Sequence, residues 1–262
     1  TYLNGIVCFI PAMAPILGAW LTVQFGWRMN FMFLTAFAIL GLIVTLFFFR
    51  ETRPADSHYQ GHILDLRRFT PIIKTPVFLF NSLICMVSMS AILVYVTLAP
   101  GWLITHLGGT VADFTFWFTL NAVISIVASF ILPTYIKRNS QRALRVGVSV
   151  LVFSGILMLA LSHIETAFAL MLPILIAALG FALSLGSAAG MSLSSFPKQA
   201  GTASALLGAM QMSGASILVV LTQYLGLSTP WLIAFHLLLL VPLWLILMSK
   251  KAHTLHPAKS TQ

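Results

Sequence analysis

The stretch that decides the fold is NFMFLTAFAILGLIVTLFFF, residues 30–49. It contains no charged side chain over 20 residues, and about 20 mostly apolar residues are enough for a helix to cross the hydrocarbon core of a bilayer. The apolar residues do not alternate with polar ones at a period of two, as they would in the wall of a membrane barrel. The stretch therefore predicts a transmembrane helix.

The chain on either side of this stretch has the same character. Hydrophobic residues make up 59% of it and charged residues 7%, whereas an ordinary soluble domain has about 25% charged residues. The sequence therefore predicts an all-α membrane protein with eight transmembrane helices, separated by breaks that hold charge, Gly, Pro or Asn. The predicted spans are residues 3–23, 30–49, 77–99, 114–136, 144–162, 167–192, 201–225 and 230–248.

Basic residues orient these spans. Of the 14 Lys and Arg residues, all but Arg28 lie on one side, in the loop 50–76, the loop 137–145, the loop with Lys198, and the C-terminal tail. Cytoplasmic loops carry such an excess, so we expect both termini and the loop 50–76 to be cytoplasmic. This clustering also explains the net charge of +9 without nucleic acid, which we exclude as a partner. Residues 63–74 form either a short helix on the membrane surface or a solvated linker.

Few residues within the spans carry reactive chemistry. Of the five acids, three lie in the loop 50–76, and Asp113 and Glu165 lie at the outer edge. His236 in the last span is interpreted as a hydrogen-bonded packing residue. No Gly-rich phosphate loop followed by Lys and no His-Glu-x-x-His metal motif is present. We therefore expect neither an enzyme nor a metal site.

Polar and small residues mark particular helix faces. Asn121, Ser125 and Ser129 recur at every fourth position, and Gln211 lies in the seventh span. They either tie helices together by hydrogen bonds or line a weakly polar cavity. Gly186 and Gly190 form a GxxxG pattern that suits close helix contact.

Several segments resemble one transporter family. Residues 11–20, PAMAPILGAW, resemble the antiporter motif of major facilitator drug exporters, which ends in Gly-Pro-x-x-Gly-Gly. Pro15 and Gly18 match it, while Ala14 and Ala19 stand where it has glycines. The additional Pro11 is similar to the bicyclomycin and chloramphenicol resistance (Bcr/CflA) branch.

Later segments resemble the same branch. They are Tyr95 with Pro100, residues 118–122 (FTLNA), and residues 200–208 (AGTASALLG) with Gln211. Residues 3–8 and 51–55 look especially like one exporter of that branch.

The resemblance implies a domain organisation. The eight spans would be helices five to twelve of a twelve-helix major facilitator fold. Residues 1–49 would then be the last two helices of the first six-helix half, 50–76 the cytoplasmic linker, 77–249 the second half and 250–262 a cytoplasmic tail. The chain begins with Thr1, and we expect the first four helices, with the proton-carrying acid, to precede it.

The resemblance also implies a function. The protein would export lipophilic or amphipathic drugs in exchange for protons, by alternating access, as a monomer in the bacterial inner membrane. It would need no cofactor, since the proton gradient supplies the energy. The expected substrate-binding residues are Tyr95, Trp117, Asn121, Phe181 and Gln211, and the expected conformational residues are Pro11, Pro15, Gly18, Gly201 and Gly208.

Two alternatives stay open. One is a transporter that moves a small metabolite on the same fold. The other is a structural membrane protein with no transport cycle. For the single aromatic residues, helix packing or contact with lipid is an alternative to substrate binding.

The topology is testable by single-cysteine labelling. With Cys8 and Cys85 replaced, we expect a membrane-impermeant thiol reagent to label Thr110→Cys on intact spheroplasts, because Thr110 precedes an outer-edge acid. Ser57→Cys should react only after lysis, since its loop carries the basic cluster. Labelling of Ser57→Cys from outside would contradict the orientation.

Overall fold

The computed structural model describes residues 17–18, 20–49 and 66–249, which form helices without a strand. Contacts divide the chain into two units, Thr1–Asp65 and Leu66–Gln262. Within the described residues, seven helices are long and apolar enough to cross a membrane. They correspond to the second to eighth predicted spans, while most of the first, 3–23, lies outside the described residues. The chain is thus an all-α membrane protein, as the sequence predicts.

The first unit contains a helical hairpin. Residues 20–25 are helical, and the next helix is α2 (Arg28–Phe48). The turn between them depends on Gly26, whose φ of 83° lies in the left-handed region that glycine adopts readily. The side chain of Asn30 donates a hydrogen bond of 2.6 Å to the hydroxyl of Thr22. This bond joins the two helices next to the turn.

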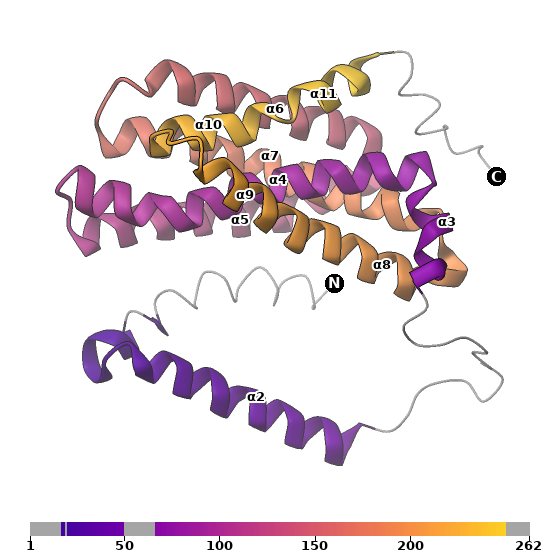
Figure 1. The fold of residues 1–262 in the computed structure, drawn as a ribbon, viewed down its shortest axis with the longest axis horizontal. Coiled ribbons are helices and arrows are strands. Elements are labelled where there is room, and N and C mark those ends of the chain that lie inside the picture. The colour runs from indigo at the N-terminus through magenta and orange to yellow at the C-terminus, as the bar shows by residue number, and fades with distance from the viewer. Residues whose placement is uncertain (1–16, 19, 50–65, 250–262) are drawn as a thin grey trace. The chain divides into compact units, whose positions relative to one another are not determined.

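The second unit contains the other six spans (Figure 1). In chain order its elements are η1 (Leu66–Phe69), α3 (Thr70–Ile73), α4 (Pro76–Pro100), η2 (Gly101–His106), α5 (Val111–Arg138), α6 (Ser140–Leu161), α7 (Ala167–Ser194), η3 (Pro197–Gln199), α8 (Ala200–Ala209), η4 (Met210–Gly214), α9 (Ala215–Gln223), α10 (Thr229–Leu238) and α11 (Val241–Met248).

The centre of this unit is the pair α4 and α7. Helix α7 packs against α4, α5 and α6, and α4 also packs against α10 and against the span made of α8, η4 and α9. The most apolar 18-residue stretches of the spans differ in burial. The buried share of this stretch is 61% in the span of α4 and 56% in α7, but only 6% in α5. A membrane protein can leave apolar faces exposed because lipid is their solvent. The core therefore lies around α4 and α7, with α5 at its edge.

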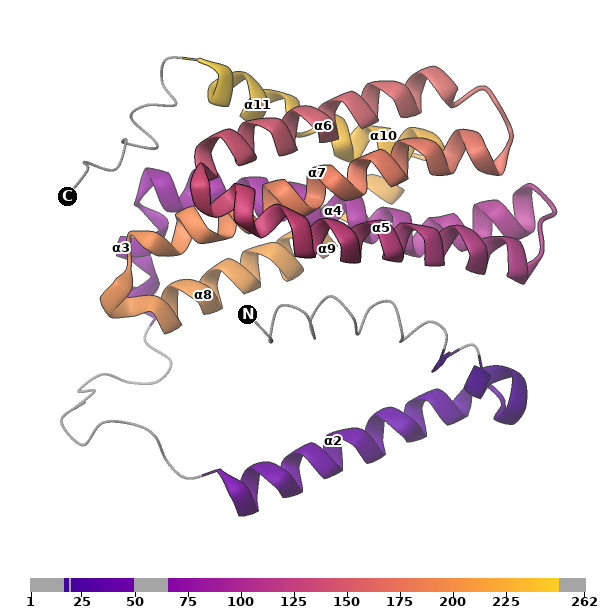
Figure 2. The same cartoon turned by 180° about the vertical axis from the view of Figure 1, so that it is seen from behind.

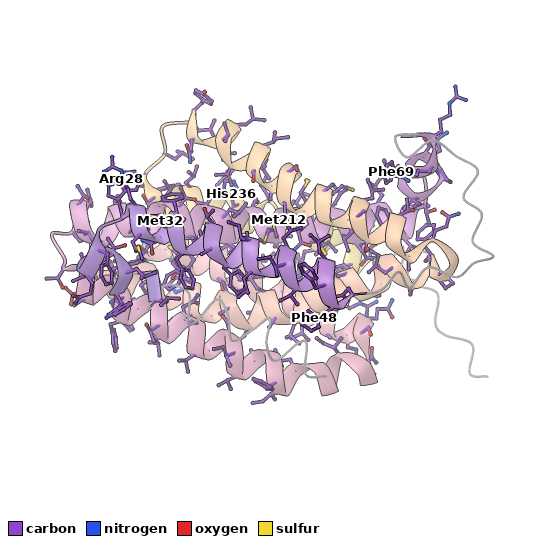
Figure 3. The ribbon with its side chains drawn as sticks, turned by 90° about the horizontal axis from the view of Figure 1, so that it is seen from below. Arg28, Met32, Phe48, Phe69, Met212 and His236 are labelled. Atoms are coloured by element: carbon purple, nitrogen blue, oxygen red, sulfur yellow. The ribbon has the colours of Figure 1, made fainter. Side chains whose placement is uncertain are left out.

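Short connections alternate between the two ends of the second unit (Figure 2). One end holds η1, α3, the turn between α5 and α6, and the end of α11, with Arg67, Arg68 and Arg142. The other end holds Asp113 and Glu165. Phe69 in η1 lies well away from His236 along the bundle (Figure 3). The basic loops thus gather at one end, which agrees with the charge pattern behind the topology prediction.

Several helix boundaries differ from the predicted ones. The third span was expected to end at residue 99, next to Pro100, but the chain continues from α4 into the π-helical η2 up to His106. Pro100 lacks the N–H that would bond to the preceding turn. The wider turn that follows still closes its hydrogen bonds, since Leu107 N donates to Trp102 O at 3.0 Å. The predicted span ended at Pro100, whereas the helical structure continues beyond it to His106.

The last two spans are interrupted as well. The last one was expected to be a single helix over 230–248, but it is broken at Leu239 and Leu240, between α10 and α11. Pro242 explains the break, because it can donate no hydrogen bond to the carbonyl of Leu238. The span before it contains the π-helical η4 between α8 and α9. Of the two alternatives for residues 63–74, the short helix is found for residues 66–73, which form η1 and α3, and its place on the membrane surface stays a prediction.

Helices α6 and α7 make a close contact in which backbone meets backbone. A Cβ atom added to Gly147 would lie 2.7 Å from the backbone nitrogen of Ser184 and 3.0 Å from the carbonyl oxygen of Gly180. Real Cβ atoms essentially never lie under 3.0 Å from another heavy atom. Backbone atoms cannot relieve such a clash by changing rotamer, as a side chain can. In contrast, a Cβ on Gly190 would meet nothing within 4 Å among the described residues. The close contact of this unit thus involves Gly147 and Gly180, not the second glycine of the GxxxG pattern.

This contact predicts a difference between two identical substitutions. Gly147→Ala should lower the free energy of unfolding by about 1–3 kcal/mol, a typical cost of overpacking. Gly190→Ala is the matched control, because its new methyl group enters open space and alanine favours helix. Thermal unfolding in detergent should show a lower Tm for Gly147→Ala alone. Equal Tm values for the two variants would contradict the contact.

Candidate functional site

The expected site residue Tyr95 stacks on an aromatic ring of α5, the helix that also carries Asn121. The ring of Tyr95 on α4 stacks with that of Phe118 on α5, with centroids 6.2 Å apart and an interplanar angle of 17°. Asn121 lies one turn further along α5, and residues three apart share a helix face. Phe114, one turn before Phe118, adds a third ring at 5.5 Å. The end of α4 and the middle of α5 thus form an aromatic wall with an amide beside it.

Two polar atoms in this wall are buried without a partner. The hydroxyl oxygen of Tyr95 and the Oδ1 atom of Asn121 have no hydrogen bond within the described residues, and neither is exposed. Most buried polar atoms are paired, and an unpaired one costs about 1–3 kcal/mol. Such atoms in a membrane protein indicate a place for water or for a polar group of a ligand. The arrangement could therefore orient an aromatic or lipophilic molecule that carries a polar group.

Trp117 and Phe181 lie nearby on elements that pack together. Trp117 of α5 is half-buried and lies 6.4 Å from the ring of Phe168 on α7. Phe181 of α7 is also half-buried against the core. Trp117 thus contributes to the packing of α5 on α7, while the placement of Phe181 beside Asn121 stays a prediction.

Gln211 lies on an element with other packing partners. It is half-buried within the π-helical η4, which packs against α4. A wide helical turn of this kind is common at functional sites. Gly214, in the same segment, lies against Met86, whose sulfur would be 2.5 Å from a Cβ at that glycine. Asn121 and Gln211 thus have different principal neighbours, and a cavity shared by both stays a prediction.

The expected conformational residues have open surroundings. A Cβ on Gly18 would lie 3.6 Å from the Oδ1 of Asn30, which is an ordinary contact, and a Cβ on Gly201 or Gly208 would meet nothing within 4 Å among the described residues. Pro11 and Pro15 lie outside the described residues. Gly147 and Gly180 make the close contact instead. Of these two, only Gly147 was not among the glycines noted in the sequence.

His236 is held in place by two hydrogen bonds. Its Nδ1 lies 2.9 Å from the carbonyl oxygen of Leu232, and its Nε2 lies 3.2 Å from the hydroxyl of Thr222. A carbonyl oxygen only accepts, so Nδ1 carries a proton and donates it to Leu232. The hydroxyl of Thr222 also lies 2.9 Å from the carbonyl oxygen of Leu218, so it links the ring to the backbone of α9. The ring links α9 to α10 and is fully buried. This confirms its interpretation as a packing residue.

The described acids lie away from the core. Asp113 accepts hydrogen bonds from the backbone and hydroxyl of Thr110, at 2.8 Å and 2.7 Å, and so caps α5. Glu165 lies 3.5 Å from the Nε2 of His106. Both sites are at the end opposite Arg142. Within the part of the chain that the structure describes, no group of His, Cys, Asp or Glu is arranged to hold a metal ion.

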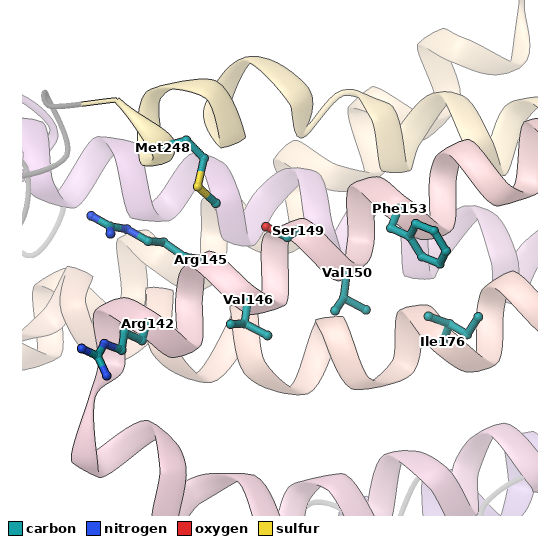
Figure 4. Close-up of a pocket in the computed structure, with 8 residues that line it drawn as sticks. All are labelled: Arg142, Arg145, Val146, Ser149, Val150, Phe153, Ile176 and Met248. Carbon is teal, nitrogen blue, oxygen red and sulfur yellow. The ribbon is translucent and has the colours of Figure 1, made fainter.

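A groove lies outside the predicted site. It has a volume of about 730 Å³, and its lining residues are Arg142, Arg145, Val146, Ser149, Val150, Phe153, Ile176 and Met248. Figure 4 shows them on α6, α7 and α11. Sequence analysis missed this groove. Its signal was present, since Arg142 and Arg145 are followed by Val146, Val150 and Phe153 at helical spacing on one face.

Comparison with known proteins agrees with this geometry. Residues 1–219 match the Major Facilitator Superfamily. The chain is 32% identical over 229 residues to the "Multidrug resistance protein MdtL" of Salmonella heidelberg (strain SL476), covering 86% of this chain and 56% of that protein. It is 32% identical over 232 residues to the protein of the same name from Klebsiella pneumoniae (strain 342), covering 86% and 57%.

The chain spans little more than half the length of these relatives. MdtL is the protein that residues 3–8 and 51–55 look especially like. The similarity extends over most of the described helices, so it includes α4, α5 and their aromatic wall. With its seven described spans and a family match over more than half of its length, this chain is a multi-pass membrane protein and belongs to the Major Facilitator Superfamily.

Proposed function

We propose that this chain is part of a secondary active transporter that exports lipophilic drugs in exchange for protons. The observation that carries the proposal is the 32% identity over 86% of the chain to relatives named multidrug resistance proteins. The proposed place of action is the bacterial inner membrane, with a monomeric protein whose linker and C-terminus are cytoplasmic. Its partners are lipid, protons and a small lipophilic or amphipathic substrate, and it needs no cofactor.

The aromatic wall supports this choice of substrate. The faces of Tyr95, Phe114 and Phe118 offer apolar and stacking contact to a flat lipophilic molecule. The unpaired oxygens of Tyr95 and Asn121 are suited to a hydrogen bond with its polar group, directly or through water. A site with a few polar groups among apolar ones accepts a range of related molecules.

Alternating access needs helices that change their relative position. Helices α8 and α9 suit this role, because the π-helical η4 divides their span and only 22% of its most apolar window is buried. Gly201 and Gly208 on α8 also face open space. We propose that this span moves against α4 during the cycle.

Proton coupling requires a titratable group within the membrane. The acids of the second unit, Asp113 and Glu165, lie at one end of it, and His236 is engaged in packing. The proposal therefore assigns the proton-carrying acid to a part of the transporter that the longer relatives have outside the stretch shared with this chain.

The site is testable with drug panels. In cells expressing the complete gene, Asn121→Leu and Gln211→Leu should change resistance unevenly, with some compounds losing protection and others keeping it. Each substitution keeps approximate volume and removes the polar groups that would orient a particular drug. Tyr95→Phe should act selectively in the same way, because it removes only the hydroxyl.

Asn81→Leu is the matched control. Asn81 is also a buried amide whose Oδ1 has no partner within the described residues, and its amide nitrogen donates to the carbonyl of Val77 at 2.7 Å. It differs from Asn121 in its position near the start of α4, away from the aromatic wall. Its substitution should weaken all compounds in parallel with protein abundance. If Asn121→Leu behaves like this control, Asn121 is a packing residue. If the unaltered gene protects against no compound and drives no proton-dependent efflux, the proposed function is wrong.

A further inference from the structure

The groove on α6 has the dimensions of one lipid leaflet. Its lining begins at Arg142, near the start of α6, and ends at Phe153. Eleven residues of helix rise by about 16 Å, and half of a hydrocarbon core is about 15 Å thick. The groove thus runs from the depth of the lipid headgroups to near the middle of the membrane.

The groove has a charged end and an apolar wall. Both guanidinium groups lie at the same end, and Val146, Val150 and Phe153 follow along α6 (Figure 4). Val146 and Phe153 are exposed, at 43% and 56%. An acyl chain could therefore lie against this wall while a headgroup lies between the two arginines.

The two arginines have no acidic partner among the described residues. The one ion pair there joins His106 and Glu165 at the opposite end of the unit. The Nε of Arg145 is buried and makes no hydrogen bond within the described residues. Taking such a group out of water is costly unless an anion or another acceptor meets it. Two guanidinium groups three residues apart on one helix face are well suited to a phosphate, which each can bind in a bidentate manner.

The groove is held open by the protein itself. The indole nitrogen of Trp244 on α11 donates a hydrogen bond of 2.8 Å to the hydroxyl of Ser149, a lining residue of α6. This bond fixes α11 at the side of the groove. The site is therefore preformed, and a ligand loses little free energy in ordering it.

We propose that this groove binds a phospholipid with an anionic headgroup. Its phosphate lies between Arg142 and Arg145, and one acyl chain lies along Val146, Val150 and Phe153. Basic pockets between membrane helices at the cytoplasmic side attract acidic lipids, and the basic end of this unit is the side that the Lys and Arg pattern predicts to be cytoplasmic. The site is separate from the aromatic wall, so it does not depend on the identity of the exported compound.

The experiment measures lipid-dependent stability. The complete protein, purified in a neutral detergent, is heated with added phosphatidylglycerol, phosphatidylcholine or inorganic phosphate. We expect phosphatidylglycerol to raise the Tm more than phosphatidylcholine does, and inorganic phosphate to have little effect. The concentration of phosphatidylglycerol needed for half of the shift should rise about tenfold or more in Arg142→Gln/Arg145→Gln, because charge-assisted hydrogen bonds are lost.

Two further variants separate the site from general effects. Arg67→Gln/Arg68→Gln removes the same charge from η1 at the same end of the unit and should keep the preference for phosphatidylglycerol. Val150→Trp should fill the groove and weaken the response to both lipids while leaving both arginines in place. The proposal is overturned if the unaltered protein does not prefer phosphatidylglycerol, if both arginine pairs lose the preference equally, or if inorganic phosphate alone gives the full shift.

Discussion

The structure depends on the fact that lipid cannot hydrogen-bond to a peptide group. Every backbone N–H and C=O within the membrane must be paired by the protein, so the described spans are helical. The same constraint acts on polar side chains. Thr35, Thr45 and Ser125 each donate to the carbonyl four residues earlier on their own helix. Against this background, nine buried side-chain atoms have no partner within the described residues, and the oxygens of Tyr95 and Asn121 are the two that belong to the aromatic wall. They are polar atoms for which the protein alone supplies no partner.

This constraint also explains how much of the fold could be predicted. A span needs only length and low charge, and both are visible in the sequence, as in residues 30–49. The interpretation of His236 succeeded for the same reason, because a buried polar group must find a partner. The interruptions of the helices could not be located in this way. Pro100 and Pro242 are equally visible in the sequence, yet a π-helical turn follows the first and a break precedes the second. The proline alone therefore does not tell which of the two outcomes a span adopts.

The candidate site was predicted less completely than the fold. The ring of Tyr95 stacks on that of Phe118, one turn before Asn121 on α5, but the role of both residues in binding stays a prediction. Gln211 is on η4, which packs on α4, and residue spacing alone does not show on which side of a bundle a helix packs. The glycines show the same limit. A GxxxG pattern marks a face that permits close contact, but only the arrangement of α6 and α7 shows that Gly147 and Gly180 make it. Arg142 and Arg145 were seen only as topology signals, although they also end a groove.

The contact between α6 and α7 has a mechanical consequence. Backbone meets backbone at Gly147 and Gly180, and the side chains of Leu151 and Leu183 fill the adjacent space. Sliding one helix past the other by a single residue would drive a Cβ atom into a peptide group. We therefore expect α6 and α7 to move together as one rigid body. The hydrogen bond from Trp244 to Ser149 attaches α11 to this pair. A rearrangement of this half of the protein would then leave the pair of α6 and α7 intact and change the position of less buried spans, such as the one made of α8, η4 and α9.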